Sequence, residues 1–161
     1  MTWRQAFFTQ ARSDFTIFQE FKERPDIPYC QKLHYLQMAT EKLAKGYLSP
    51  TNGNPPPKTH LALVRFLQIS KGQPEIRRKL GFENNHRGYS AYIDGLLHIA
   101  DQIEQLAPVG NCDQPNSEYP WVTNGRSIIS PTNYNFPEFD KQALTKFQGL
   151  IMSLFRIIPR E

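Results

Sequence analysis

The stretch EIRRKLGFENNHRGY, residues 75 to 89, gathers side chains that can act on a phosphate group. It holds four cations and one histidine but only two carboxylates. Arginine binds phosphate oxygens through paired N–H groups, and histidine can move a proton near neutral pH. The candidates for binding or cleaving a phosphate backbone are Arg77, Arg78, His86 and Arg87. The alternative is a polar connector between two helices whose cations lie in water.

Two aromatic residues form a second candidate group. Tyr119 and Trp121 lie in a segment rich in proline and asparagine, and exposed rings of this kind can stack on nucleobases. The other interpretation is that the rings fasten a long loop to the rest of the protein. The sequence leaves both possibilities open.

Motifs for other chemistries do not occur in the sequence. There is no Gly-rich phosphate loop, no Ser/His/Asp order and no paired-carboxylate motif. Cys30 and Cys112 are far apart and lack the spacing of zinc ligands, so neither a metal, a cofactor nor a disulfide framework is expected. Unpaired cysteines and the lack of a signal-like or membrane-spanning apolar run predict a cytoplasmic protein without a membrane contact.

Charge is unevenly distributed along the chain. The formal net charge is +4, and residues 58 to 88 contain seven basic and two acidic side chains. Residues 89 to 161 contain five basic and eight acidic side chains. A basic middle third can attract nucleic acid or another anion, although such an excess also occurs on surfaces that bind nothing.

The elements that carry these residues follow from hydrophobic periodicity. Apolar residues recur every three or four positions in five segments, each of which is predicted to be an amphipathic helix. Thr2 and Gln5 form a capping box at the first helix, and Thr59 can cap the third. The predicted helices are residues 2–21, 28–47, 59–70, 90–107 and 139–158, with a short additional helix between Pro74 and Gly81.

These elements predict a single domain over residues 1–161. Its fold class is all-α: a five-helix, largely up-and-down bundle with a long Pro/Asn-rich loop before the last helix. Residues 121 to 129 of that loop, WVTNGRSII, can form a small hairpin around Asn124 and Gly125.

Three stretches of the chain resemble the HEPN family, the higher eukaryotes and prokaryotes nucleotide-binding domains. LHYLQMATEKLAKGYL, residues 33 to 48, matches a family helix with a Gln, a small residue, Glu-Lys and a further Lys. THLALVRFL, residues 59 to 67, is similar to the family's start of the following helix. EYPW and the later YNFPEFDKQALTKFQGLIMSLF are similar to its crossover into the last helix. The residues that match in the first stretch are Gln37, Ala39, Glu41, Lys42 and Lys45.

The resemblance implies a helical bundle, a homodimer and a role in nucleic-acid-directed systems, often beside a nucleotidyltransferase-like protein. Ribonuclease members of the family carry an Arg followed after four to six residues by a His. Here seven residues separate Arg78 from His86, so the pattern is not met.

The function predicted from the sequence is therefore a non-catalytic HEPN-like bundle that binds a nucleic acid, a nucleotide or a protein partner. Two alternatives stay open. One is a metal-independent, toxin-like ribonuclease that uses Arg78 and His86. The other is a purely structural antitoxin or scaffold subunit.

Overall fold

The protein is described by a computed structural model that covers residues 1–50, 54, 61–108, 113–123 and 125–158. Six α-helices lie in these residues, and the all-α class is confirmed. No helix in the described ranges combines the length and the apolarity needed to cross a membrane. The helices are α1 (Trp3–Lys22), α2 (Tyr29–Leu48), α3 (Ala62–Ser70), α4 (Pro74–Lys79), α5 (His86–Glu104) and α6 (Lys141–Arg156).

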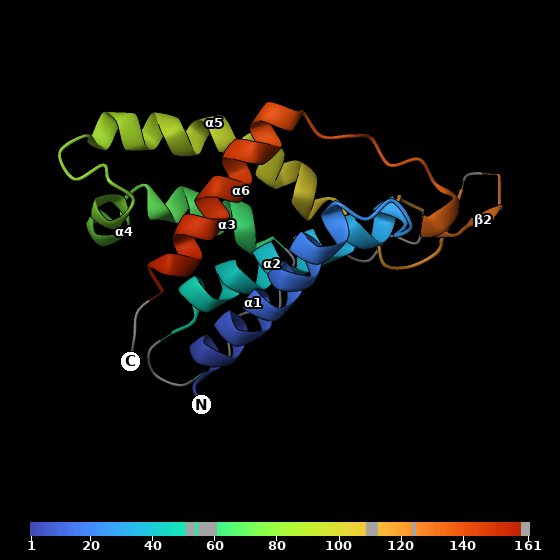
Figure 1. The fold of residues 1–161 in the computed structure, drawn as a ribbon, viewed down its shortest axis with the longest axis horizontal. Helices are drawn as coiled ribbons and strands as arrows, with labels where there is room; N and C mark the ends of the chain where they lie inside the picture. Colours follow the sequence, from blue (N-terminus) through green and yellow to red (C-terminus); the bar gives the residue numbers. More distant parts are fainter. Residues whose placement is uncertain (51–53, 55–60, 109–112, 124, 159–161) are drawn as a thin grey trace.

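The first two helices form a long antiparallel pair, which runs diagonally across Figure 1. The predicted capping box is present, because Gln5 N donates to Thr2 Oγ1 at 3.2 Å and Thr2 N to Gln5 Oε1 at 2.8 Å. Between the two helices, Lys42 Nζ binds the buried carboxylate of Asp14 at 2.6 Å. Gln10 also donates to Asp14, so the buried charge is fully compensated.

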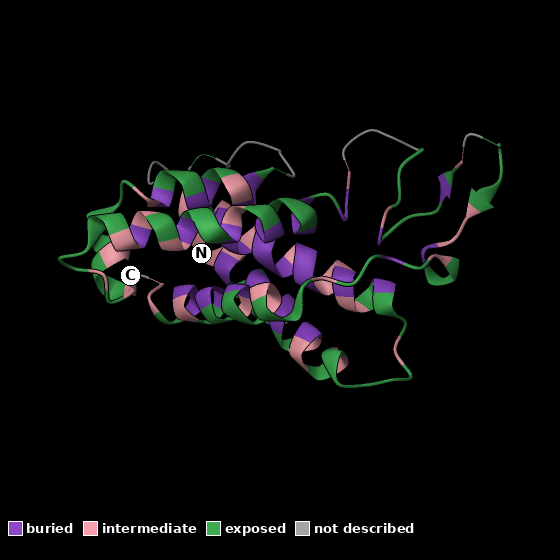
Figure 2. Ribbon diagram, turned by 90° about the horizontal axis from the view of Figure 1, so that it is seen from above, coloured by how far each residue is buried: buried purple, intermediate pink, exposed green. Residues whose placement is uncertain are grey.

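The hydrophobic core lies between this pair and the helices α3, α5 and α6, where Figure 2 shows the buried segments gathered. Each helix contributes one apolar stripe, as its periodicity predicts. Fully buried side chains of large volume include Leu36, Leu43, Leu63, Leu67, Tyr89, Ile93, Ile103, Phe147, Leu150, Ile151 and Leu154.

The predicted helix boundaries differ most from the observed ones at α5 and α3. The helix expected over 90–107 is α5, which begins at His86 because the Asn85 side chain accepts from Gly88 N and caps it. Helix α3 begins at Ala62, and Thr59, its expected cap, lies outside the described residues. Together with the short α4, six helices lie in the described residues.

The segment before α6 contains the predicted hairpin. Strands β1 (Trp121–Val122) and β2 (Ile128–Ile129) pair in antiparallel register, with Trp121 opposite Ile129. The expected turn residue Asn124 lies outside the described residues. A 3-10 turn, η1 (Pro131–Asn133), follows and contacts α2, so the long segment covers the end of the molecule where the α1–α2 turn lies (Figure 1).

Candidate functional site

Helix α4 carries most of the basic residues singled out in the sequence. Pro74 occupies its first turn, where the missing N–H costs nothing, and its last turn holds Arg77, Arg78 and Lys79. Cations are favoured there by the negative end of the helix dipole. The chain then turns at Gly81, whose φ of 84° is the left-handed conformation that glycine adopts most readily.

Both arginines of α4 line one shallow cavity of about 370 Å³. Arg78 is exposed, and no ion pair or hydrogen bond engages its guanidinium among the described residues. Arg77 is half-buried, and its Nε has no hydrogen-bond acceptor. The cavity is lined by Pro74, Glu75, Arg77, Arg78 and Glu83.

One of the two carboxylates in this cavity is already neutralised. Lys79 Nζ lies 3.0 Å from Glu75 Oε1, and this contact lowers the pKa of the Glu75 carboxyl. Burial raises the pKa of the neighbouring Tyr89 hydroxyl. The positive charge of Arg77 lowers the same pKa by a smaller amount. The cavity therefore keeps two guanidinium groups whose N–H donors are not used up by the protein.

His86 and Arg87 form the first turn of α5 and are both exposed. Within the described parts of the chain, no hydrogen bond or ion pair joins His86 to Arg78. The structure thus brings Arg77 and Arg78 to one cavity and leaves His86 and Arg87 across the Leu80–Asn85 connector, outside the lining of that cavity.

The two aromatic candidates have different environments. Tyr119 is 60% exposed, so its ring is open to a ligand. Trp121 is only 3% exposed and packs edge-on against Tyr134 at 5.0 Å, with Phe136 at 6.2 Å. A ring buried to this extent agrees with the interpretation of a loop anchor, and its role as a ligand-binding residue stays a prediction.

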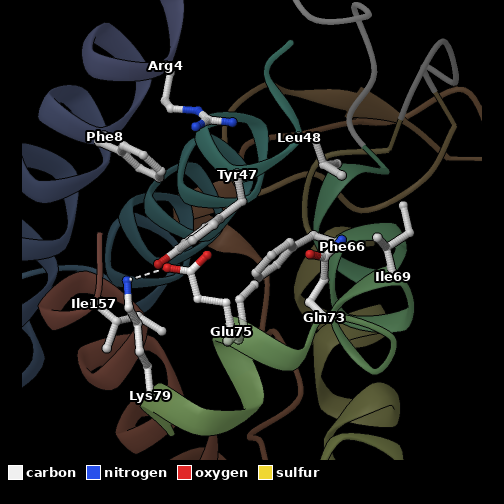
Figure 3. Close-up of a pocket in the computed structure, with 11 residues that line it drawn as sticks. Arg4, Phe8, Tyr47, Leu48, Phe66, Ile69, Gln73, Glu75, Lys79 and Ile157 are labelled. Atoms are coloured by element: carbon white, nitrogen blue, oxygen red, sulfur yellow. Dashed lines mark ion pairs between the residues drawn. The ribbon is translucent and has the colours of Figure 1, made fainter. Parts of the chain in front are cut away.

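A second cavity lies on another side of α4 and was not foreseen from the sequence (Figure 3). It encloses about 260 Å³ above stacked rings of Tyr47 and Phe66, whose centroids are 4.7 Å apart. The Glu75–Lys79 ion pair lies at this cavity as well. Its lining consists of Arg4, Phe8, Tyr47, Leu48, Phe66, Ile69, Gln73, Glu75, Ile76, Lys79 and Ile157.

Arg4 supplies a second cation to this cavity, beside the Lys79 that pairs with Glu75. Its Nη2 donates to the Ser49 carbonyl at 3.1 Å, which holds the guanidinium in place, while its Nε is buried without an acceptor. No local pattern could have identified Arg4, because the first turn of α1 meets α4 only through the packing of the helices. Among the described residues, no group of three His, Cys, Asp or Glu side chains is arranged to hold a metal ion.

The protein is therefore all-α, and its short basic helix α4 lines two cavities. Comparison of the chain with family models, with curated proteins and with solved structures gave no match. The resemblance to HEPN domains therefore stays a prediction, as do the homodimer and the nucleotidyltransferase-like partner that it implies.

Proposed function

We propose that this protein is a non-catalytic binding module for a phosphate-bearing ligand, with single-stranded RNA as the ligand to test first. One observation carries the proposal: Arg77 and Arg78 line one open cavity, and among the described residues their guanidinium groups form no ion pair and no hydrogen bond. Phosphate oxygens are the acceptors that such groups bind best. The basic excess of residues 58 to 88 adds a longer-range attraction for the same ligand.

The second cavity supports a ligand with both phosphate and apolar parts. The rings of Tyr47 and Phe66 and the Arg4 guanidinium line this cavity together with residues of α4. Other residues of α4 line the basic cavity. A strand laid across α4 would place phosphates on Arg77 and Arg78, and the apolar cavity is suited to a base or another flat group.

A salt titration with charge-neutral variants tests this proposal. Binding of a short labelled single-stranded RNA is followed by fluorescence anisotropy between about 50 and about 200 mM salt. We expect Arg77→Gln/Arg78→Gln to weaken binding about tenfold at low salt and to reduce the salt slope by about 1.4, the value for two phosphate contacts on a single strand. The single Arg78→Gln variant, whose side chain is exposed, should show part of the effect without any cost in stability.

Arg126→Gln is the matched control, because it removes the same charge from the exposed loop next to β2, at the end of the molecule opposite α4 in Figure 1. Binding equal in the Arg126 and Arg78 variants, or no binding at low salt, would contradict the proposal. Cleavage of the RNA by the wild type that is lost in His86→Ala would replace it with the ribonuclease alternative. A protein that neither binds nor cleaves RNA would fit a structural subunit.

A further inference from the structure

A third cavity lies far from α4 and has the opposite electrostatic character. It encloses about 360 Å³ between the last turns of α5 and the segment that leads into α6. This volume is in the range of cavities that take small organic molecules. The lining consists of Asp101, Gln102, Gln105, Leu106, Gln114, Pro115, Tyr134, Phe136, Pro137, Glu138 and Phe139.

The charged groups of this cavity are all acidic. Asp101 and Glu138 contribute carboxylates, and neither forms an ion pair within the described chain. No lysine or arginine is among the described residues that line the cavity. Because unpaired carboxylates with no cation beside them create a negative potential, the site favours a positively charged ligand.

The end of α5 adds to this negative potential. Gln102 and Gln105 place the last turn of the 19-residue helix against the cavity, and that turn contains no basic side chain. The C-terminal end of a helix carries about half a negative elementary charge, and cations are stabilised there. The end of the helix and the two carboxylates therefore both make the potential in the cavity more negative, and neither contribution depends on the other.

The apolar part of the lining includes three aromatic residues, Tyr134, Phe136 and Phe139. Tyr134 and Phe136 meet edge-on, with centroids 4.9 Å apart, and Phe136 is buried against Trp121. These contacts hold the rings in fixed positions, so the apolar surface is formed before a ligand arrives. Aromatic faces attract cations in addition to packing against flat apolar groups.

We propose that this cavity binds a small organic cation, an amine or amidinium attached to a flat apolar body. The charged end lies near Asp101 and Glu138 at the end of α5, and the body packs on the rings of Tyr134 and Phe139, the two partly exposed aromatic residues of the lining. This ligand has the opposite charge to the phosphate-bearing ligand of α4, so the two sites are independent and one can fail without the other.

Benzamidine is a suitable probe, because benzamide is its neutral counterpart of nearly the same shape and benzoate its anionic one. Binding is followed by the chemical shifts of backbone amides in residues 101–106, 134–136, 138 and 139 of the isotopically labelled protein. We expect benzamidine to shift these amides at millimolar concentration, benzamide to bind at least about tenfold more weakly, and benzoate not to bind.

The variant Asp101→Asn/Glu138→Gln keeps the shape of the lining and should weaken benzamidine binding about tenfold. Its matched control is Glu20→Gln/Glu23→Gln, which removes two exposed carboxylates that lie outside this cavity and outside both cavities at α4, and which should bind as the wild type does. Equal binding of benzamidine and benzamide, shifts confined to other residues, no shifts at all, or equal losses in the two double variants would each overturn the proposal.

Discussion

Glu104, a buried carboxylate in the last turn of α5, accepts hydrogen bonds from the first turn of another helix, α3. It lies at the end of α5 and is 4% exposed, and its Oε1 accepts from Leu63 N at 2.5 Å and from Val64 N at 3.1 Å. These two amides belong to the first turn of α3, where backbone donors have no partner within the helix. Glu104 therefore replaces the side-chain cap that Leu61, the residue before α3, does not provide.

This position raises the pKa of Glu104 above its ordinary value of 4.5, mainly by burial, although the two amides act in the opposite direction. The folded protein then keeps the proton at pH values where the unfolded chain has lost it. The stabilisation that follows from this raised pKa is therefore fully present below pH 4.5. It is lost as the pH rises from 4.5 through the higher pKa of the folded protein.

The prediction at this scale concerns substitutions of Glu104. Glu104→Gln keeps an oxygen acceptor and should remove that part of the pH dependence, so its stability relative to the wild type rises between about pH 5 and about pH 8. Glu104→Ala leaves two buried donors unsatisfied and should lower the free energy of unfolding by about 2 kcal/mol or more. Urea denaturation at both pH values measures these effects. A pH-independent difference between Glu104→Gln and the wild type would contradict the pKa assignment.

At the scale of single elements, the start of α5 depends on two residues that share one small space. Asn85 Oδ1 accepts from Gly88 N at 2.7 Å. A Cβ atom at residue 88 would lie only 2.3 Å from Nδ2 of Asn85, so the observed conformation of the cap leaves no room for a side chain at that position. This pair explains why the helix begins four residues before the Ser90 at which its apolar stripe predicted a start.

The corresponding prediction is a change of sign in a double-mutant cycle. Asn85→Ala should cost about 1 kcal/mol, and Gly88→Ala should also destabilise, because its methyl group displaces the cap. In the Asn85→Ala background, Gly88→Ala should instead stabilise by a few tenths to about 1 kcal/mol, since alanine is the better helix former. Thermal or urea denaturation of the four proteins gives the coupling.

Gly95→Ala is the control for this cycle, because Gly95 lies within α5 and a Cβ there would meet nothing within 4 Å. It should stabilise the protein by the same amount in both backgrounds. Additive effects of Asn85 and Gly88 would show that the cap does not depend on the glycine.

At the scale of the whole molecule, the last helix is joined to the first two by bonds to its final carbonyls. Tyr47 Oη donates to the Leu154 carbonyl at 2.7 Å, and Arg12 Nη2 donates to that of Phe155 at 2.6 Å. Burial raises the pKa of the Tyr47 hydroxyl, so it keeps the proton that it donates. These bonds satisfy two carbonyl groups in the last turn of α6, where no N–H of the same helix is left to donate to them.

Removing the Tyr47 hydroxyl should therefore loosen α6 as well as lower stability. We expect Tyr47→Phe to cost about 1 to 2 kcal/mol and to speed hydrogen exchange in the last turn of α6. Tyr92→Phe is the matched control, because Tyr92 is partly buried but its hydroxyl makes no hydrogen bond in the described chain, and it should change little. Equal effects of the two substitutions would mean that the bond to Leu154 contributes nothing.

The sequence by itself determined the helical class, the approximate helices, the hairpin and the basic character of residues 75 to 89. Periodicity, proline positions and charge are local properties, so they can be read along the chain. Only the tertiary structure decided that Trp121 is buried, that Arg4 lies near α4, and that Glu104 caps α3. Such contacts join residues far apart in sequence, and they depend on how the helices pack rather than on any local pattern.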